Sequence, residues 1–174
     1  MNEVRLETME YAPYYKNYVD LAGSGAFLTL LKSSQEEFVN FVEMIPSVKL
    51  EYAYLDGKWT IKEVLLHLID SERVFQYRAL RFARQDKTDL PGFDENFFVP
   101  NSFANQRSAA SLIEEYSAVR SATITLFSSF SDDVLQSIGT ANKSQMSVRA
   151  IAYVIVGHQN HHINVLRERY LKSE

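Results

Sequence analysis

Residues 57–84 read GKWTIKEVLLHLIDSERVFQYRALRFAR, and this stretch predicts a long helix with a marked start. Thr60 followed by Glu63 has the pattern of a capping box, in which each side chain accepts a hydrogen bond from the other residue's backbone N–H. Apolar residues then recur at three- and four-residue steps, which is helical periodicity: Ile61, Val64, Leu65, Leu68 and Phe75. We therefore expect a helix from the Thr60 cap to about Arg84.

Three further segments carry the same periodicity. They run from Gly25 to Ile45 (with Pro46 as the stop signal), from Ser108 to Phe130 and from Ser147 to Leu171. Shorter helical turns are expected at Tyr18–Leu21 and after Ser131, and no segment shows a strand-like alternation of useful length. Four helices of these lengths favour an all-α fold, an antiparallel four-helix bundle with no sheet.

The connection between the second and third long helices is unusually long. It covers 85–107 and contains Leu90-Pro-Gly-Phe-Asp94, whereas helix connections in bundles usually have two to eight residues. The length predicts a crossover between these two helices. Long loops often form walls of functional sites, so this loop is a candidate wall, although a purely connecting role is the simpler interpretation for any single residue in it.

Composition excludes several classes of protein. The chain has 174 residues, 46% of them hydrophobic, which fits one globular domain over residues 1–174. Its 18 Lys and Arg against 22 Asp and Glu argue against a nucleic-acid binder. The absence of Cys excludes a thiol nucleophile, thiolate-bound metal and disulfides. No apolar run has the length of a signal peptide or membrane span, so we expect a soluble, cytoplasmic protein that binds neither membrane nor nucleic acid.

The histidines carry the strongest chemical signal. His158 and His162 lie in the middle of the apolar arc of the last helix, one turn apart, where two imidazoles can reach one metal ion. His161 lies toward the edge of that arc and is the weaker candidate. His67 lies at the edge of the apolar arc of its own helix, and a crossing helix pair could bring it opposite the other two. Three histidines with an open coordination position are typical of catalytic Zn²⁺ or Ni²⁺ sites; the alternative is that each imidazole bonds a backbone carbonyl or water.

Three charged residues also lie where they could act at a site. Glu72 falls inside an apolar arc, which favours an ion pair with an arginine of another helix, or else a carboxylate that orients a ligand or acts as a base beside the metal. Arg78 and Arg81 could bind an anionic substrate, although solvated or paired arginines are more usual on helices. The chain lacks the H-E-x-x-H motif of zinc proteases and the Glu-x-x-His pairs of di-iron bundles.

Two runs of sequence resemble the signatures of the DinB-like superfamily. The first is the quoted stretch 57–84, and the second is Gly157-His-Gln-Asn-His-His162 with the following Val165-Leu-Arg-Glu-Arg-Tyr170; the Leu90–Glu95 loop is similar to one branch of the family. The resemblance implies a four-helix bundle with a long crossover and a divalent metal held by His67, His158 and His162. His161 matches a frequent family residue but not the usual ligand position.

The resemblance also implies an activity. The family includes metal-dependent hydrolases and enzymes that transfer low-molecular-weight thiols such as bacillithiol to electrophiles, and several members are homodimers. We therefore expect a metal-dependent enzyme that activates water or a cosubstrate thiol toward a small electrophilic substrate; without Cys, any thiol must come from the cosubstrate. The alternative is a non-catalytic bundle that binds a metal or small ligand as a binding or stress-response module. A metal facing an open cleft would favour the enzyme.

Overall fold

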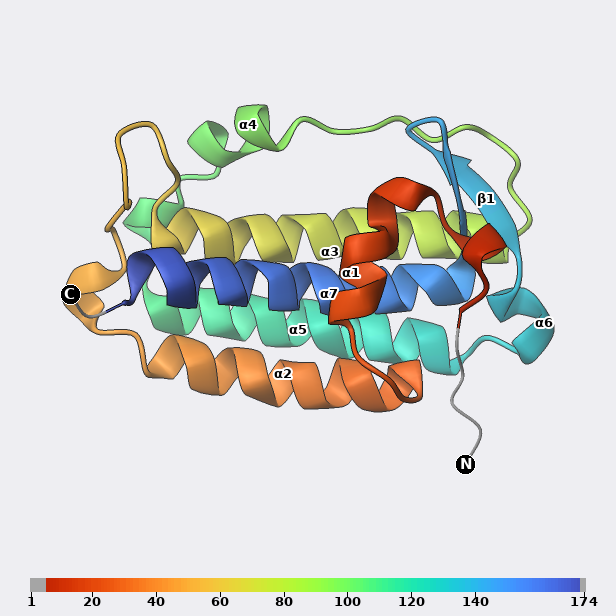
Figure 1. Ribbon diagram of the computed structural model, residues 1–174, viewed down its shortest axis with the longest axis horizontal. Coiled ribbons are helices and arrows are strands. Elements are labelled where there is room, and N and C mark those ends of the chain that lie inside the picture. The colour runs from red at the N-terminus through yellow and green to blue at the C-terminus, as the bar shows by residue number, and fades with distance from the viewer. Residues whose placement is uncertain (1–5, 173–174) are drawn as a thin grey trace.

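The computed structural model describes residues 6–172 and is mainly helical (Figure 1). The predicted four-helix bundle is confirmed, and its long helices are α2 (Phe27–Glu43), α3 (Ile61–Ala83), α5 (Ala109–Ser128) and α7 (Val148–Val165). Shorter helices are α1 (Lys16–Leu21), α4 (Glu95–Phe98) and α6 (Asp132–Leu135). Short 3₁₀ turns cover Thr8–Glu10, Pro13–Tyr15, Ser47–Lys49, Val99–Asn101 and Ala104–Gln106, and a π-helical turn covers Leu166–Tyr170 after α7.

The helix starts follow the capping signals in the sequence. The Thr60 hydroxyl accepts a bond from the Glu63 backbone N–H at 3.2 Å, and the Glu63 carboxylate accepts one from the Thr60 N–H at 2.7 Å. Ser108, Ser131 and Ser147 each accept a bond from the N–H three residues ahead, at the starts of α5, α6 and α7. These caps satisfy N–H groups that have no partner inside the helix.

The order of the helices around the bundle explains the long crossover. Each of α2 and α3 packs against both α5 and α7. The neighbours α3 and α5 run in the same direction, and so do α2 and α7, so the expected antiparallel arrangement holds only for α3 with α7 and α2 with α5 (Figure 1). Because α5 runs parallel to α3, it starts at the end of the bundle opposite to the end where α3 finishes. The chain after α3 must therefore return along the whole length of the bundle. The predicted crossover between α3 and α5 is therefore confirmed.

A small hairpin departs from the prediction of no sheet. Strands β1 (Ile138–Ala141) and β2 (Ser144–Ser147) pair antiparallel, joined by Asn142 and Lys143, whose φ angles are 49° and 60°. Positive φ at both turn residues is the type I′ geometry that matches strand twist. Four residues per strand are too few to show an alternating pattern, so these strands could not be predicted from the sequence. The crossover loop joins this hairpin, since the Leu90 N–H donates to the Thr140 carbonyl at 3.0 Å.

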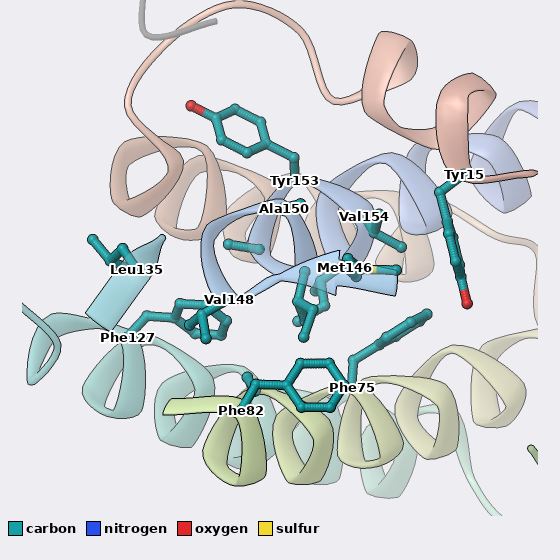
Figure 2. Packing of buried hydrophobic residues seen from close by; sticks show 14 of the residues in the cluster. Tyr15, Phe75, Phe82, Phe127, Leu135, Met146, Val148, Ala150, Tyr153 and Val154 are labelled. Atoms are coloured by element: carbon teal, nitrogen blue, oxygen red, sulfur yellow. The ribbon is translucent and has the colours of Figure 1, made fainter. Parts of the chain in front are cut away.

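Two apolar clusters fill the bundle. The cluster near the hairpin includes Phe75 and Phe82 of α3, which lie on the side of the helix that faces Met146 and α7 (Figure 2). A Cβ added to Gly139 would lie 1.9 Å from the Phe82 ring, so β1 needs glycine at this contact. The second cluster joins α2, α5 and the first half of α3 at the other end of the bundle. Within residues 6–172, no helix is both long and apolar enough to span a membrane.

The short helix α1 packs across α7 at a glycine. A Cβ on Gly157 would lie 1.7 Å from the backbone carbonyl oxygen of Tyr18, so the two backbones touch here and no other residue fits without a shift. This contact holds α1 against the turn of α7 that carries His158. The ring centroid of Tyr18 lies 5.3 Å from that of His158, edge to face.

Candidate metal centre

Helices α3 and α7 bring together the three histidines that the sequence singled out. The Nε2 atom of His158 lies 3.2 Å from Nε2 of His67 and 3.1 Å from Nε2 of His162. The three potential ligand atoms all lie within 4.8 Å of one another. Two of these residues are one turn apart on α7, as the helix pattern predicts, and the third comes from the antiparallel neighbour α3, which the sequence left as one possible arrangement.

The nitrogen spacing fits a shared cation. Two nitrogens bound to one Zn²⁺ at about 2.0–2.1 Å in tetrahedral geometry lie roughly 3.3 Å apart, close to the distances in the cluster. Hydrogen bonds alone do not satisfy the group, because one imidazole Nε2 carries either one proton or one lone pair. Nε2 of His158 therefore bonds one of its two neighbours at a time. A cation at the centre serves all three nitrogens at once.

Burial keeps these imidazoles neutral. Desolvation lowers the pKa of His67 to about 4 and that of His162 to about 3, the latter with smaller contributions from His67 and His161. The pKa of His158 lies well below 6.5 because the ring is buried and the neighbouring histidines would repel its charge. Metal ligands must be neutral imidazoles, so at neutral pH the cluster is already in the binding form.

His161 does not join the cluster. Its ring packs against the edge of Tyr18, with 5.6 Å between the centroids, and it is only half-buried. Burial lowers its pKa in the same direction as for the other histidines, with the Arg169 charge adding to the effect. Its place beside the cluster rather than in it agrees with its position at the edge of the apolar arc.

An open cleft of about 430 Å³ leads to the three histidines. Its walls come from the N-terminal turns and α1, from α3, from the crossover loop, from the hairpin and from α7: Tyr14, Tyr15, Tyr18, Trp59, His67, Ser71, Phe75, Arg78, Gly92, Phe93, Glu95, Asn142, Ser144, His158, His161 and His162. Gly92, Phe93 and Glu95 confirm the crossover loop as the candidate wall, so the simpler interpretation of a purely connecting role is wrong for these three residues. The tyrosines and hairpin residues were not predicted, because they belong to short segments whose place over the bundle follows from tertiary packing alone.

Glu72 lies outside this cleft and forms the buried ion pair. Its two carboxylate oxygens accept bonds from the Arg120 guanidinium at 2.8 and 2.9 Å, and Thr123 donates to one of them at 2.6 Å. Arg120 also donates to the Gln159 side chain at 3.0 Å. The interpretation as a structural pair is confirmed, and no bond joins the carboxylate to the histidines. Arg120 itself was not predicted, although a buried Glu72 already required such a partner.

The two arginines of α3 differ in their surroundings. Arg81 pairs with Asp86 and contacts the Tyr77 hydroxyl, away from the cleft, so its ordinary paired role is confirmed. Arg78 is buried and lines the cleft, and it takes part in no ion pair within the described part of the chain. The expectation of a paired or solvated arginine at this position is therefore wrong.

Comparisons with known proteins agree with the fold. A sequence profile of the DinB superfamily matches residues 30–166. No curated protein matches the chain. One similar solved structure is YfiT from Bacillus subtilis, described as a probable metal-dependent hydrolase with an unusual four-helix bundle topology; it is 16% identical over 97% of this chain and 90% of its own, with a TM-score of 0.70. Another is a mycothiol-dependent maleylpyruvate isomerase, 11% identical, with a TM-score of 0.62 over 83% of this chain and 59% of that protein.

Proposed function

The chain belongs to the DinB superfamily, and from this membership and its cluster of three imidazoles we propose that it is a metal-dependent enzyme. His67, His158 and His162 would each supply one nitrogen ligand to a divalent cation, for which Zn²⁺ and Ni²⁺ have the best-matched ligand preference. A bound cation of this kind supplies Lewis acidity, which lowers the pKa of a coordinated water or thiol toward neutral.

The observation that carries this proposal is the open cleft over the cluster. Structural metal sites are closed by four protein ligands, whereas catalytic sites keep a position for water or substrate. Within residues 6–172, three nitrogens come together, and the space beside them is a cleft rather than a fourth side chain. Trp59, Tyr18 and Phe75 pack around the imidazoles and limit the water that surrounds a reacting group.

The reaction proposed is hydrolysis of a small electrophilic substrate, or transfer of a cosubstrate thiol to it. The two structural neighbours support these two reactions, since one is described as a probable metal-dependent hydrolase and the other as mycothiol-dependent. The chain has no Cys, so its own side chains offer no thiol. The cleft volume of about 430 Å³ lies within the range of small-molecule sites.

The test begins with metal analysis of protein purified without a His-tag. We expect about one divalent ion per chain in the natural sequence and in His161→Ala, and a loss of bound metal in His162→Ala. A panel of esters, amides and electrophiles, with and without low-molecular-weight thiols, then assays the metal-loaded protein against His162→Ala. Turnover that requires both metal and a thiol would assign thiol transfer, and turnover with metal alone would assign hydrolysis.

The same assays can contradict the proposal. Stoichiometric metal without turnover on any class of substrate would favour a non-catalytic metal-binding bundle. Protein that binds no divalent ion after incubation with Zn²⁺ or Ni²⁺ would mean that the three histidines are core residues, and the enzyme assignment would fall.

A further inference from the structure

One buried positive charge in the cleft has no anionic partner among residues 6–172. The side chain of Arg78 is only 6% exposed, its Nε has no hydrogen-bond partner, and its Nη2 reaches only the Pro91 carbonyl at 3.5 Å. Its other neighbours are the Phe75 ring, 5.6 Å from Cζ, and the Tyr15 phenol, which forms a side-chain hydrogen bond with the guanidinium. Burial raises the pKa of Tyr15 and the Arg78 charge opposes that rise, so the phenol remains a neutral neighbour.

The other buried cations show what a structural role looks like in this fold. Within residues 6–172, three basic side chains belonging to Lys or Arg are buried: Lys62, Arg78 and Arg120. Lys62 pairs with Glu51, and Arg120 pairs with Glu72. Arg78 alone of the three has no carboxylate partner in the described part of the chain. Because burying an unpaired charge is expensive, a cation kept in this state indicates a partner supplied from outside the chain.

The position of Arg78 relates it to the histidines. It lies eleven residues after His67, which is three helical turns, so both project from the same face of α3. The Arg78 Cζ is 5.6 Å from the Phe75 ring centroid, and that ring is 6.3 Å from the His158 ring, so Cζ lies at most about 12 Å from His158. Both ends border the same cleft.

The cleft between them is poor in compensating charge. Glu95 on the crossover loop is the acidic residue of its lining, and it is exposed. Ser71, one turn after His67, has a buried hydroxyl without a hydrogen-bond partner. Two buried polar atoms without a hydrogen-bond partner, the Ser71 hydroxyl and the Arg78 Nε, therefore lie on α3 beside the cleft.

We propose that Arg78 binds an oxyanion of the substrate, such as a carboxylate, while the reacting atom lies at the three histidines. A planar guanidinium matches the two oxygens of a carboxylate, and such charge-assisted bonds are strong when shielded from water. The substrate is then an extended organic acid whose anionic and reacting groups are on the order of 10 Å apart. The identity of the reacting end rests on the proposed function, whereas the anion site at Arg78 does not.

The experiment measures binding with a graded series of probes. Calorimetry with Zn²⁺-loaded protein compares ω-mercaptoalkanoic acids from mercaptopropionic to mercaptoundecanoic acid with ω-mercapto alcohols of the same lengths. We expect the acids to bind at least about tenfold more tightly than the alcohols, with a maximum near mercaptooctanoic acid, where the span fits the cleft. Equal binding of acids and alcohols at every length would overturn the proposal without any variant.

Variants then test whether the preference for acids depends on Arg78. Arg78→Met should remove both the preference for acids and the optimum in length, whereas Arg81→Met, a matched charge loss on the same helix outside the cleft, should keep both. Ligand-free Arg78→Met should melt no lower than the natural protein, because it loses an unpaired buried charge. A large drop in its melting temperature, or an unchanged preference for acids, would mean that Arg78 has a structural role.

A metal-free arm separates this inference from the proposed function. Octanoate should raise the melting temperature of His162→Ala but not that of His162→Ala/Arg78→Met. If that pattern holds while the natural protein binds no metal, the anion site stands and the metal-dependent function falls. If metal binds and octanoate has no Arg78-dependent effect, the anion site is wrong and the metal proposal is untouched.

Discussion

The carboxylate of Glu72 and the guanidinium of Arg120 face each other in the bundle interior through two hydrogen bonds, 2.8 and 2.9 Å long. Arg120 is fully buried, and it also donates to the Leu31 carbonyl at 3.1 Å and to Gln159. The pair therefore joins α3 and α5 to α2 and α7. Gln159 follows His158 in the sequence, so this network fixes the turn of α7 that carries the histidines.

Replacing one member of this pair should destabilise the fold more than replacing both members. Arg120→Met leaves a buried, unpaired carboxylate, and we expect a loss of about 3–5 kcal/mol in the free energy of unfolding. Glu72→Leu/Arg120→Met, which removes both charges, should lose less than the single variant. Urea unfolding measures all three proteins. Arg73→Met, which breaks the partly exposed pair with Glu115, is the control and should lose about 1 kcal/mol or less.

A larger loss in the double variant than in Arg120→Met would contradict this account. If Glu72→Gln kept its stability but lost bound metal, the carboxylate would act on the metal site after all, and the structural interpretation would be wrong.

Relationships within one helix were predictable from the sequence. The capping box at Thr60 sets the start of α3, and four-residue spacing alone puts His158 and His162 on one side of α7. His67 needed tertiary information, because its distance from the other two depends on how α3 crosses α7. The resemblance to a known family supplied that relation before the structure did.

Relationships between distant segments were not predictable. The hydrophobic periodicity of α3 and α5 does not show that the two helices pack in parallel. Only the length of their connection suggested it. The hairpin strands have four residues each, too few for an alternating pattern to be read. Whether an arginine is paired also depends on its neighbours in space, which is why Arg78 and Arg81 looked equivalent in the sequence and differ in the structure.

Replacing single histidines should distinguish a metal ligand from a histidine that only lies beside the cluster. We expect His162→Ala to lose stoichiometric divalent metal, because two imidazoles remain, and His161→Ala to keep it, because its ring lies outside the cluster. Both variants should retain the helical circular dichroism spectrum. Metal content by mass spectrometry is the measurement. Loss of metal in His161→Ala with retention in His162→Ala would reverse the assignment.

A methyl group at Gly157 should detach α1 from α7. The added Cβ would lie 1.7 Å from the Tyr18 carbonyl oxygen, a backbone atom that cannot rotate away. Overpacking typically lowers the free energy of unfolding by about 1–3 kcal/mol, whereas the higher helix propensity of alanine raises it by up to about 1 kcal/mol. Gly157→Ala should therefore be less stable overall. Chymotrypsin should then cleave faster at Tyr14–Tyr18, which mass spectrometry of the fragments can follow.

The matched control is Gly92→Ala on the crossover loop. Its Cβ would meet the Asn142 side chain at 2.9 Å, and that exposed side chain can move by rotation about its Cα–Cβ bond, so the change in stability should be small. Equal stability and equal cleavage for the two variants would show that α1 accommodates the methyl group by moving as a unit.

The pH dependence of the metal-free protein follows from the buried histidines. In the unfolded chain histidine titrates near 6.5, whereas burial lowers the pKa of folded His67 to about 4. Between these values the unfolded state binds more protons, so the free energy of unfolding should fall as the pH drops from 6.5 toward 4. His67 alone contributes a loss on the order of 3 kcal/mol. Urea unfolding of metal-free protein measures it, and His67→Gln should show a shallower slope.

The lowered pKa values of the histidines also determine the pH at which acid should release the metal. Free imidazoles would compete with metal below about 6.5, but the folded cluster gains protons only near the lowered pKa values, about 4 for His67 and about 3 for His162. The affinity of the folded protein should therefore stay nearly constant from pH 7 to about pH 5, as should the extra stability from bound metal. Thermal melts with and without Zn²⁺ measure this extra stability as the gap between the two melting temperatures. A gap that closes between pH 7 and pH 6 would mean that the imidazoles titrate as exposed groups, and that the cluster opens when the metal leaves.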